Sequence, residues 1–129
     1  MIIFEFITSR IQSFKYAFDG LGYVIRTQRN AWIHAVASLF VFILAFWLGV
    51  TAFEWAVLIL SVGMVWMAEF INTAIETAVD LATADFHPNA KIGKDVGAAA
   101  VLIAASASAG IGIIILGPPL WMRVHAWFT

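Results

Sequence analysis

The sequence predicts an all-α membrane protein, with an N-terminal amphipathic surface helix and three transmembrane helices in one domain, residues 1–129. Of its 129 residues, 63% are hydrophobic and 12% are charged, and the mean hydropathy is +0.94. A chain with so little polar surface cannot enclose a water-soluble core. The apolar residues gather in three runs, and each is long enough for a crossing that needs about 20 residues.

Residues 3–27 are predicted to form the surface helix. Its apolar side chains recur at alternating steps of four and three: Ile7, Ile11, Phe14, Phe18, Leu21 and Ile25. Arg10, Lys15 and Asp19 lie elsewhere around the helix. This pattern suits the boundary between lipid headgroups and acyl chains, although it could also dock on a soluble partner.

The three crossings are expected at about residues 31–50, 53–80 and 96–116. The first contains no Lys, Arg, Asp or Glu, and His34 is its only titratable group. A break at residues 49–52 separates it from the second crossing, and a polar loop from Thr83 to Lys94 precedes the third. Gly117, Pro118 and Pro119 are expected to end the third helix.

The distribution of basic residues predicts the orientation of the chain. They gather before the first crossing and in the second loop, whereas the turn at residues 49–54 has none: Arg10, Lys15, Arg26, Arg29, Lys91 and Lys94. We therefore expect a multi-pass protein of the cytoplasmic (inner) membrane whose N-terminus and 83–94 loop face the cytoplasm. The net charge of −1 provides no basic field for nucleic acid, and the absence of cysteine excludes thiolate chemistry.

The second crossing carries a polar stripe. Glu69, Asn72, Glu76 and Asp80 project within an arc of roughly 80° at 100° per residue. Glu69 is expected just inside the edge of the hydrocarbon, where an ionisable group usually serves a function, and a general base is the role we predict. Two carboxylates and an amide oxygen are also ligands that Mg²⁺ accepts. Asp80 could instead be an ordinary solvated acid.

Lys94 and Asp95 are expected at the start of the third helix, where free N–H groups favour phosphate. A simpler interpretation makes Lys94 an interfacial anchor and Asp95 an N-cap. Carboxylates on one helix face also occur in proton or cation transporters, so a small oligomeric transporter is the alternative function. A structural membrane subunit would have no use for the ordered stripe.

The segments Glu69 to Asp80, His87-Pro88 and Lys94 to Ala99 closely resemble the signature of the prokaryotic diacylglycerol kinase/undecaprenol kinase family. This resemblance implies a homotrimer that phosphorylates a membrane lipid alcohol, diacylglycerol or undecaprenol, with ATP as co-substrate and Mg²⁺ as cofactor. Arg29-Asn30 and Ile33-His34 look somewhat more like the undecaprenol kinase branch.

The resemblance also implies roles for individual residues. Glu69 and Asn72 would be catalytic, Glu76 and Gln28 would hold the metal, and Arg10, Glu69 and Ala98 would contact the lipid. The nucleotide would be contacted by Arg10, Gln28, Glu76, Asp85, Phe86, His87, Lys94 and Asp95. The family commonly has a glutamate where this chain has Gln28, so the metal site is expected to carry one negative charge fewer.

Overall fold

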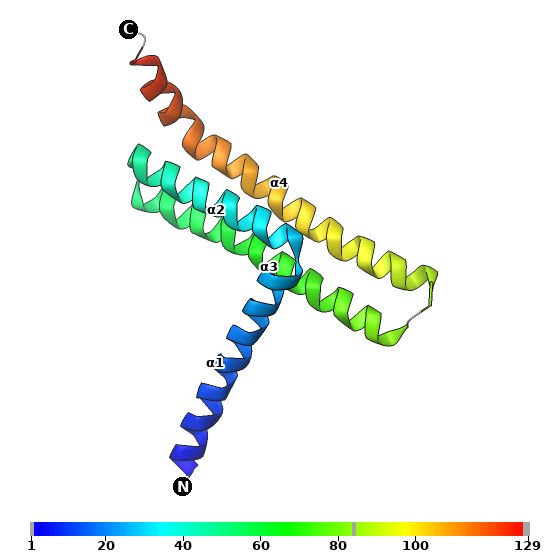
Figure 1. The fold of residues 1–129 in the computed structure, drawn as a ribbon. Helices are drawn as coiled ribbons and strands as arrows, with labels where there is room; N and C mark the ends of the chain where they lie inside the picture. Colours follow the sequence, from blue (N-terminus) through cyan, green and yellow to red (C-terminus); the bar gives the residue numbers. More distant parts are fainter. Residues whose placement is uncertain (1, 84, 128–129) are drawn as a thin grey trace.

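The computed structural model describes residues 2–83 and 85–127, which form four helices and no strand. These are α1 (Ile2–Thr27), α2 (Arg29–Leu48), α3 (Ala52–Ala82) and α4 (Pro88–His125) (Figure 1). The helices α2, α3 and α4 are each long and apolar enough to cross a membrane. The predicted all-α membrane fold, with one amphipathic helix followed by three apolar ones, is therefore confirmed.

The turn between α2 and α3 is specified by local sequence. Gly49 ends α2 with φ of +70°, a left-handed conformation that glycine adopts without strain. Thr51 begins α3 with a capping box, because its Oγ1 accepts from the Glu54 amide while the Glu54 carboxylate accepts from the Thr51 amide. The predicted break at residues 49–52 coincides with these two caps.

The last helix is longer at both ends than the predicted third crossing, residues 96–116. Pro88 occupies the first helical position with His87 as N-cap, so the helix begins well before Val96. It also continues through Pro118 and Pro119 to His125. Side chains on both sides of the proline pair, Leu116 and Leu120, pack with the same core cluster, and this packing supports a helix that the prolines alone would have ended.

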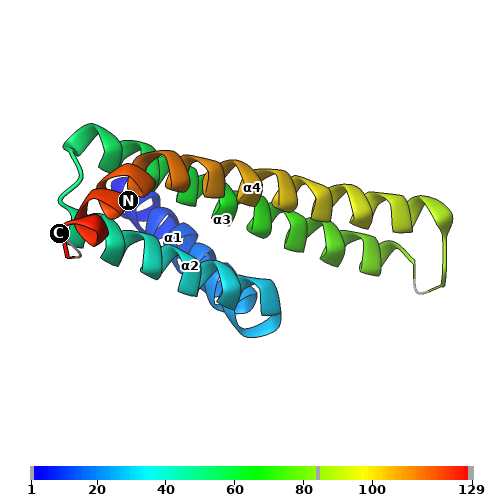
Figure 2. The same cartoon turned by 90° about the horizontal axis from the view of Figure 1, so that it is seen from above.

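α3 and α4 lie side by side over most of their length, and α2 packs against both (Figures 1 and 2). The bundle is closed at the α2–α3 turn by a core cluster of four buried side chains: Ala45, Leu48, Leu58 and Leu116. At the opposite end the α3–α4 hairpin extends beyond the beginning of α2 (Figure 2).

α1 contacts the bundle mainly through α2 and then leaves it (Figure 1). Of its periodic apolar side chains, those of Ile7, Ile11, Phe14, Phe18 and Leu21 are exposed. The outer faces of α2 and α4 are likewise covered with large exposed apolar residues. Such a surface is compatible with a lipid environment and not with water.

Candidate active site

Glu69 is a carboxylate buried inside the helix bundle. Its side chain is 1% exposed, and Oε2 has no hydrogen-bond partner within the described residues. His34, on α2, places Nε2 3.7 Å from this oxygen, which is longer than a hydrogen bond. A buried carboxylate oxygen without a hydrogen bond is costly, so Glu69 is a candidate reactive group.

Asn72 and Glu76 continue the polar face of α3. Asn72 Nδ2 donates to Glu76 Oε1 at 2.9 Å, whereas Asn72 Oδ1 is buried without a partner in the described part of the chain. Glu69 and Asn72 are both buried and Glu76 is half-buried. The predicted polar stripe therefore points into the protein along this part of α3.

Gly97 on α4 allows the two helices to approach each other at Asn72. A Cβ atom at Gly97 would lie 2.5 Å from Asn72 Oδ1 and 3.5 Å from its Cγ. No side chain larger than hydrogen fits there without displacing the amide. The position of Asn72 is thus set by a close backbone contact as well as by Glu76.

A second group of polar side chains lies where α3 ends and α4 begins. Lys94 Nζ pairs with Asp80, and Lys91 Nζ pairs with Asp95. These four residues, together with Val79, Thr83, Asp85, Phe86, His87 and Ala90, line an open cavity of about 320 Å³. The cavity combines cations, carboxylates and an exposed aromatic ring within reach of water.

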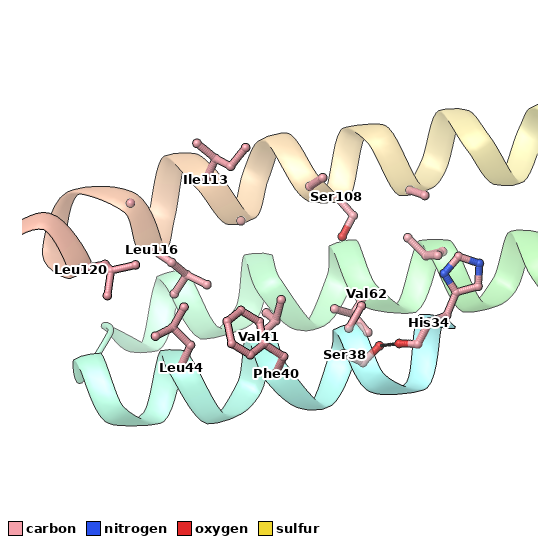
Figure 3. A pocket seen from close by; sticks show the side chains of 16 residues that line it. His34, Ser38, Phe40, Val41, Leu44, Val62, Ser108, Ile113, Leu116 and Leu120 are labelled. Atoms are coloured by element: carbon pink, nitrogen blue, oxygen red, sulfur yellow. Dashed lines mark hydrogen bonds between the residues drawn. The ribbon is translucent and has the colours of Figure 1, made fainter. Parts of the chain in front are cut away.

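A larger and mostly apolar cavity of about 390 Å³ lies between α2, α3 and α4. His34 stands at one end and Leu120 at the other (Figure 3). Its walls are mainly aliphatic, with the hydroxyls of Ser38 and Ser108 as isolated polar groups. Among the described residues that line it, His34 is the one titratable side chain, and Glu69 is not one of them.

The model of the family described as prokaryotic diacylglycerol kinase matches residues 15–116. The chain belongs to this family. An undecaprenol kinase of Bacillus subtilis is 40% identical over 109 residues, covering 84% of this chain and 89% of the relative. A diacylglycerol kinase of Synechocystis is 43% identical over 109 residues, 84% of this chain and 62% of the relative. The diacylglycerol kinase of Escherichia coli K12 is 40% identical over 90 residues, 64% of this chain and 74% of the relative.

As a member of the prokaryotic diacylglycerol kinase family, the protein is a membrane lipid kinase that uses ATP. The structure brings the predicted site residues of this kinase together in two groups. Glu69, Asn72 and Glu76 share one face of α3. The open cavity at the hairpin gathers Asp85, Phe86, His87, Lys94 and Asp95.

Three predicted site residues are not gathered with these groups. Arg10 lies on α1, where its guanidinium stacks over Phe6 at 5.2 Å from the ring centroid. The side chain of Gln28, at the break between α1 and α2, makes no capping hydrogen bond. Ala98 is exposed on α4.

Lys94 and Asp95 do not lie at the start of a helix, so that prediction was wrong. Because α4 begins at Pro88, the first-turn amides without a backbone partner in the helix are those of residues 89 and 90, and Asn89 N donates instead to His87 Nδ1 at 3.2 Å. Lys94 and Asp95 lie within the helix, so only their side chains are available to a ligand.

Two residues of the buried group were not assigned to the site from the sequence. His34 stood out as the only titratable group of its crossing, but its proximity to Glu69 depends on how α2 packs against α3. Gly97 is one small residue in a helix rich in alanine and glycine, and only the packed structure distinguishes it.

Proposed function

We propose that this lipid kinase transfers the γ-phosphate of ATP to the primary hydroxyl of diacylglycerol or undecaprenol, with Glu69 as general base. The observation that supports this most is the buried Glu69 carboxylate, which has an unpartnered oxygen on the same helix face as Asn72 and Glu76. A base at this place can serve an alcohol that stays in the lipid.

In the proposed reaction the Glu69 carboxylate accepts the proton of the lipid hydroxyl while the hydroxyl oxygen attacks the γ-phosphorus. The new oxygen–phosphorus bond forms as the bond to the bridging oxygen breaks, and ADP leaves with the electron pair. The Asn72 amide orients the reacting groups, a role supported by its fixed position between Glu76 and Gly97.

The open cavity at the hairpin is the proposed nucleotide site. Lys94 would neutralise phosphate charge, and Asp85, Phe86, His87 and Asp95 would line the pocket. The Lys94–Asp80 pair is largely exposed, and exposed ion pairs contribute only about 0–1 kcal/mol, so a phosphate group can displace the aspartate at little cost.

The donor set on α3 fits a nucleotide-bound Mg²⁺. Glu76 is half-buried, and the Asn72 and Glu69 side chains each carry an unpartnered buried oxygen. Within residues 2–83 and 85–127 no three His, Asp or Glu side chains converge as in an all-protein metal site. One or two carboxylates suffice for Mg²⁺ when phosphates and water complete its shell, so Glu76 would hold the ion, which supplies charge neutralisation to the phosphates. A contribution from Gln28 requires its side chain to move toward Glu76.

The kinase is proposed to act as a homotrimer in the cytoplasmic (inner) membrane, with N-terminus and active site facing the cytoplasm. The orientation is supported by the basic residues of α1 and the hairpin. An oligomer is supported by α1, which carries the predicted site residue Arg10 and leaves the bundle within one copy (Figure 1). Cross-linking in native membranes should give trimers, and exclusive recovery of monomer would contradict the assembly.

The alternative function, a proton or cation transporter, requires polar groups along a path through the bilayer. The cavity beyond His34 is instead mostly aliphatic over its length to Leu120 (Figure 3). Proton flux in liposomes without label transfer to lipid would favour the transporter over the kinase.

The test is transfer of radiolabel from ATP to lipid by the purified protein in mixed micelles, with diacylglycerol and undecaprenol assayed side by side. Glu69→Gln should lower the rate by about 10²-fold or more, because the base is lost while side-chain volume is kept. Glu5→Gln is the matched control, since Glu5 is exposed on α1, and it should behave as the parent. Label in neither lipid, or a fully active Glu69→Gln variant, would refute the proposal.

A further inference from the structure

His34 and Glu69 come from different helices and face each other inside the bundle. The His34 side chain is 14% exposed, and its Nε2 atom is buried without a hydrogen-bond partner in the described structure. The facing Oε2 of Glu69, 3.7 Å away, is also unpartnered. These two buried polar atoms therefore face each other without a hydrogen bond. A movement of less than 1 Å would bring them to a hydrogen-bond distance of about 3 Å.

The position of His34 is supported by contacts around it. Trp66 on α3 meets the imidazole edge to face, with ring centroids 6.4 Å apart and an interplanar angle of 67°. Trp66 Nε1 donates to Ser38 Oγ at 3.1 Å, and Ser38 Oγ donates to the backbone oxygen of His34 at 2.6 Å. Trp66 lies one turn before Glu69, so this network links the imidazole to the helix that carries the carboxylate.

His34 lies beside Glu69 and also lines the apolar cavity. The imidazole stands at one end of that cavity (Figure 3), whereas Glu69 is not among the described residues that line it. Of the ionisable side chains, His34 on α2 lies 3.7 Å from Glu69 Oε2, and Glu76 lies two turns later on the same face of α3. α4 contributes Gly97 and Val101 as its buried residues in this region, and both are uncharged.

We infer that His34 is a positioning residue that acts through Glu69. Its Nε2–H donates to Glu69 Oε2 and holds the carboxylate so that the other oxygen, Oε1, faces the lipid hydroxyl. This inference rests on the proposed function, because it assigns His34 a purpose only where Glu69 is the base. Misplacing a reacting group by about 1 Å can cost about 10²-fold in rate.

The first test separates the effect on kcat from the effect on KM. His34→Leu should lower kcat at least about tenfold and leave the KM for ATP and for lipid within about twofold of the parent. His34→Gln should retain most of the parent kcat, because its amide Nε2 can donate from the place of the imidazole Nε2. His125→Leu, at the far end of α4, is the control for the same substitution outside the site.

The second test requires neither activity nor a His34 variant. In protein labelled with ¹⁵N-histidine, Glu69→Gln should move the Nε2 resonance of His34 and leave that of His125 unchanged. A His34 resonance that does not respond would refute the contact. A folded His34→Leu variant with parental kcat, or a His34→Gln variant as slow as His34→Leu, would refute the positioning role.

Failure of this inference and failure of the proposed function give different results. If the parent phosphorylates lipid and Glu69→Gln does not, while His34→Leu is unimpaired, only the role of His34 is lost. If the parent labels neither lipid, the proposed function is lost whether or not the His34 resonance responds to Glu69→Gln.

Discussion

Replacing Gly97 with alanine tests whether the position of the Asn72 amide controls the reaction. The new Cβ would lie 2.5 Å from Asn72 Oδ1, and ordinary contacts of such an atom begin at 3.4 Å. Asn72 must therefore retreat by about 1 Å, or α4 must move away from α3. Retreat is restricted because the amide is buried and hydrogen-bonded to Glu76.

A displacement of about 1 Å at a positioned group can cost about 10²-fold in rate, so kcat of Gly97→Ala should fall by about that factor. Overpacking should also lower the free energy of unfolding by about 1–3 kcal/mol. Initial rates of label transfer in mixed micelles measure the first effect, and denaturation in detergent measures the second.

Gly93→Ala is the matched control for this experiment. Gly93 lies one turn earlier on α4, and its Cβ would meet Val79 Cγ2 at 3.8 Å, an ordinary contact. This variant should keep the parental rate. A folded Gly97→Ala protein that is as active as Gly93→Ala would show that the close approach to Asn72 does not govern the reaction.

Three further predictions concern the nucleotide, the metal and the fold. Lys94→Gln should raise the KM for ATP at least about tenfold, because a cation that neutralises phosphate charge is lost. Lys15→Gln on α1 is the control and should leave this KM unchanged. Equal KM values for the two variants would exclude a phosphate contact by Lys94. Gln28→Glu should lower the Mg²⁺ concentration needed for half-maximal activity by adding a carboxylate, and an unchanged metal titration would argue against a metal role at this position. Thr51→Ala removes the hydroxyl that caps α3 and accepts from the Glu54 amide, so the free energy of unfolding should fall by about 1 kcal/mol with kcat unaltered. An unfolding midpoint equal to that of the parent would contradict this last prediction.

Most of the fold could be predicted because it depends on local patterns. The apolar runs identify the helices, and the glycine and threonine at the α2–α3 turn have intrinsic preferences that specify it. The ends of α4 could not be predicted in this way. Its continuation through Pro118 and Pro119 accompanies tertiary packing of Leu116 and Leu120, which no local rule contains.

The candidate site was also predictable only where it depends on the pattern within one helix. Helical spacing places Glu69, Asn72 and Glu76 on one face, and the structure confirms that arrangement. The partners from other helices, His34 and Gly97, depend on how the helices pack. Periodicity within one segment carries no information about which residue of a second segment will face it.

The length of the α3–α4 hairpin beyond α2 bears on the depth in the membrane at which each substrate is held. α2 has 20 residues and is about 30 Å long, close to the thickness of the hydrocarbon core, whereas the 31 residues of α3 reach about 46 Å. If α2 spans the hydrocarbon core, the far end of the hairpin extends about 16 Å beyond it. The nucleotide could then bind and leave through bulk water, and the lipid alcohol would need to rise only to the level at which α2 begins.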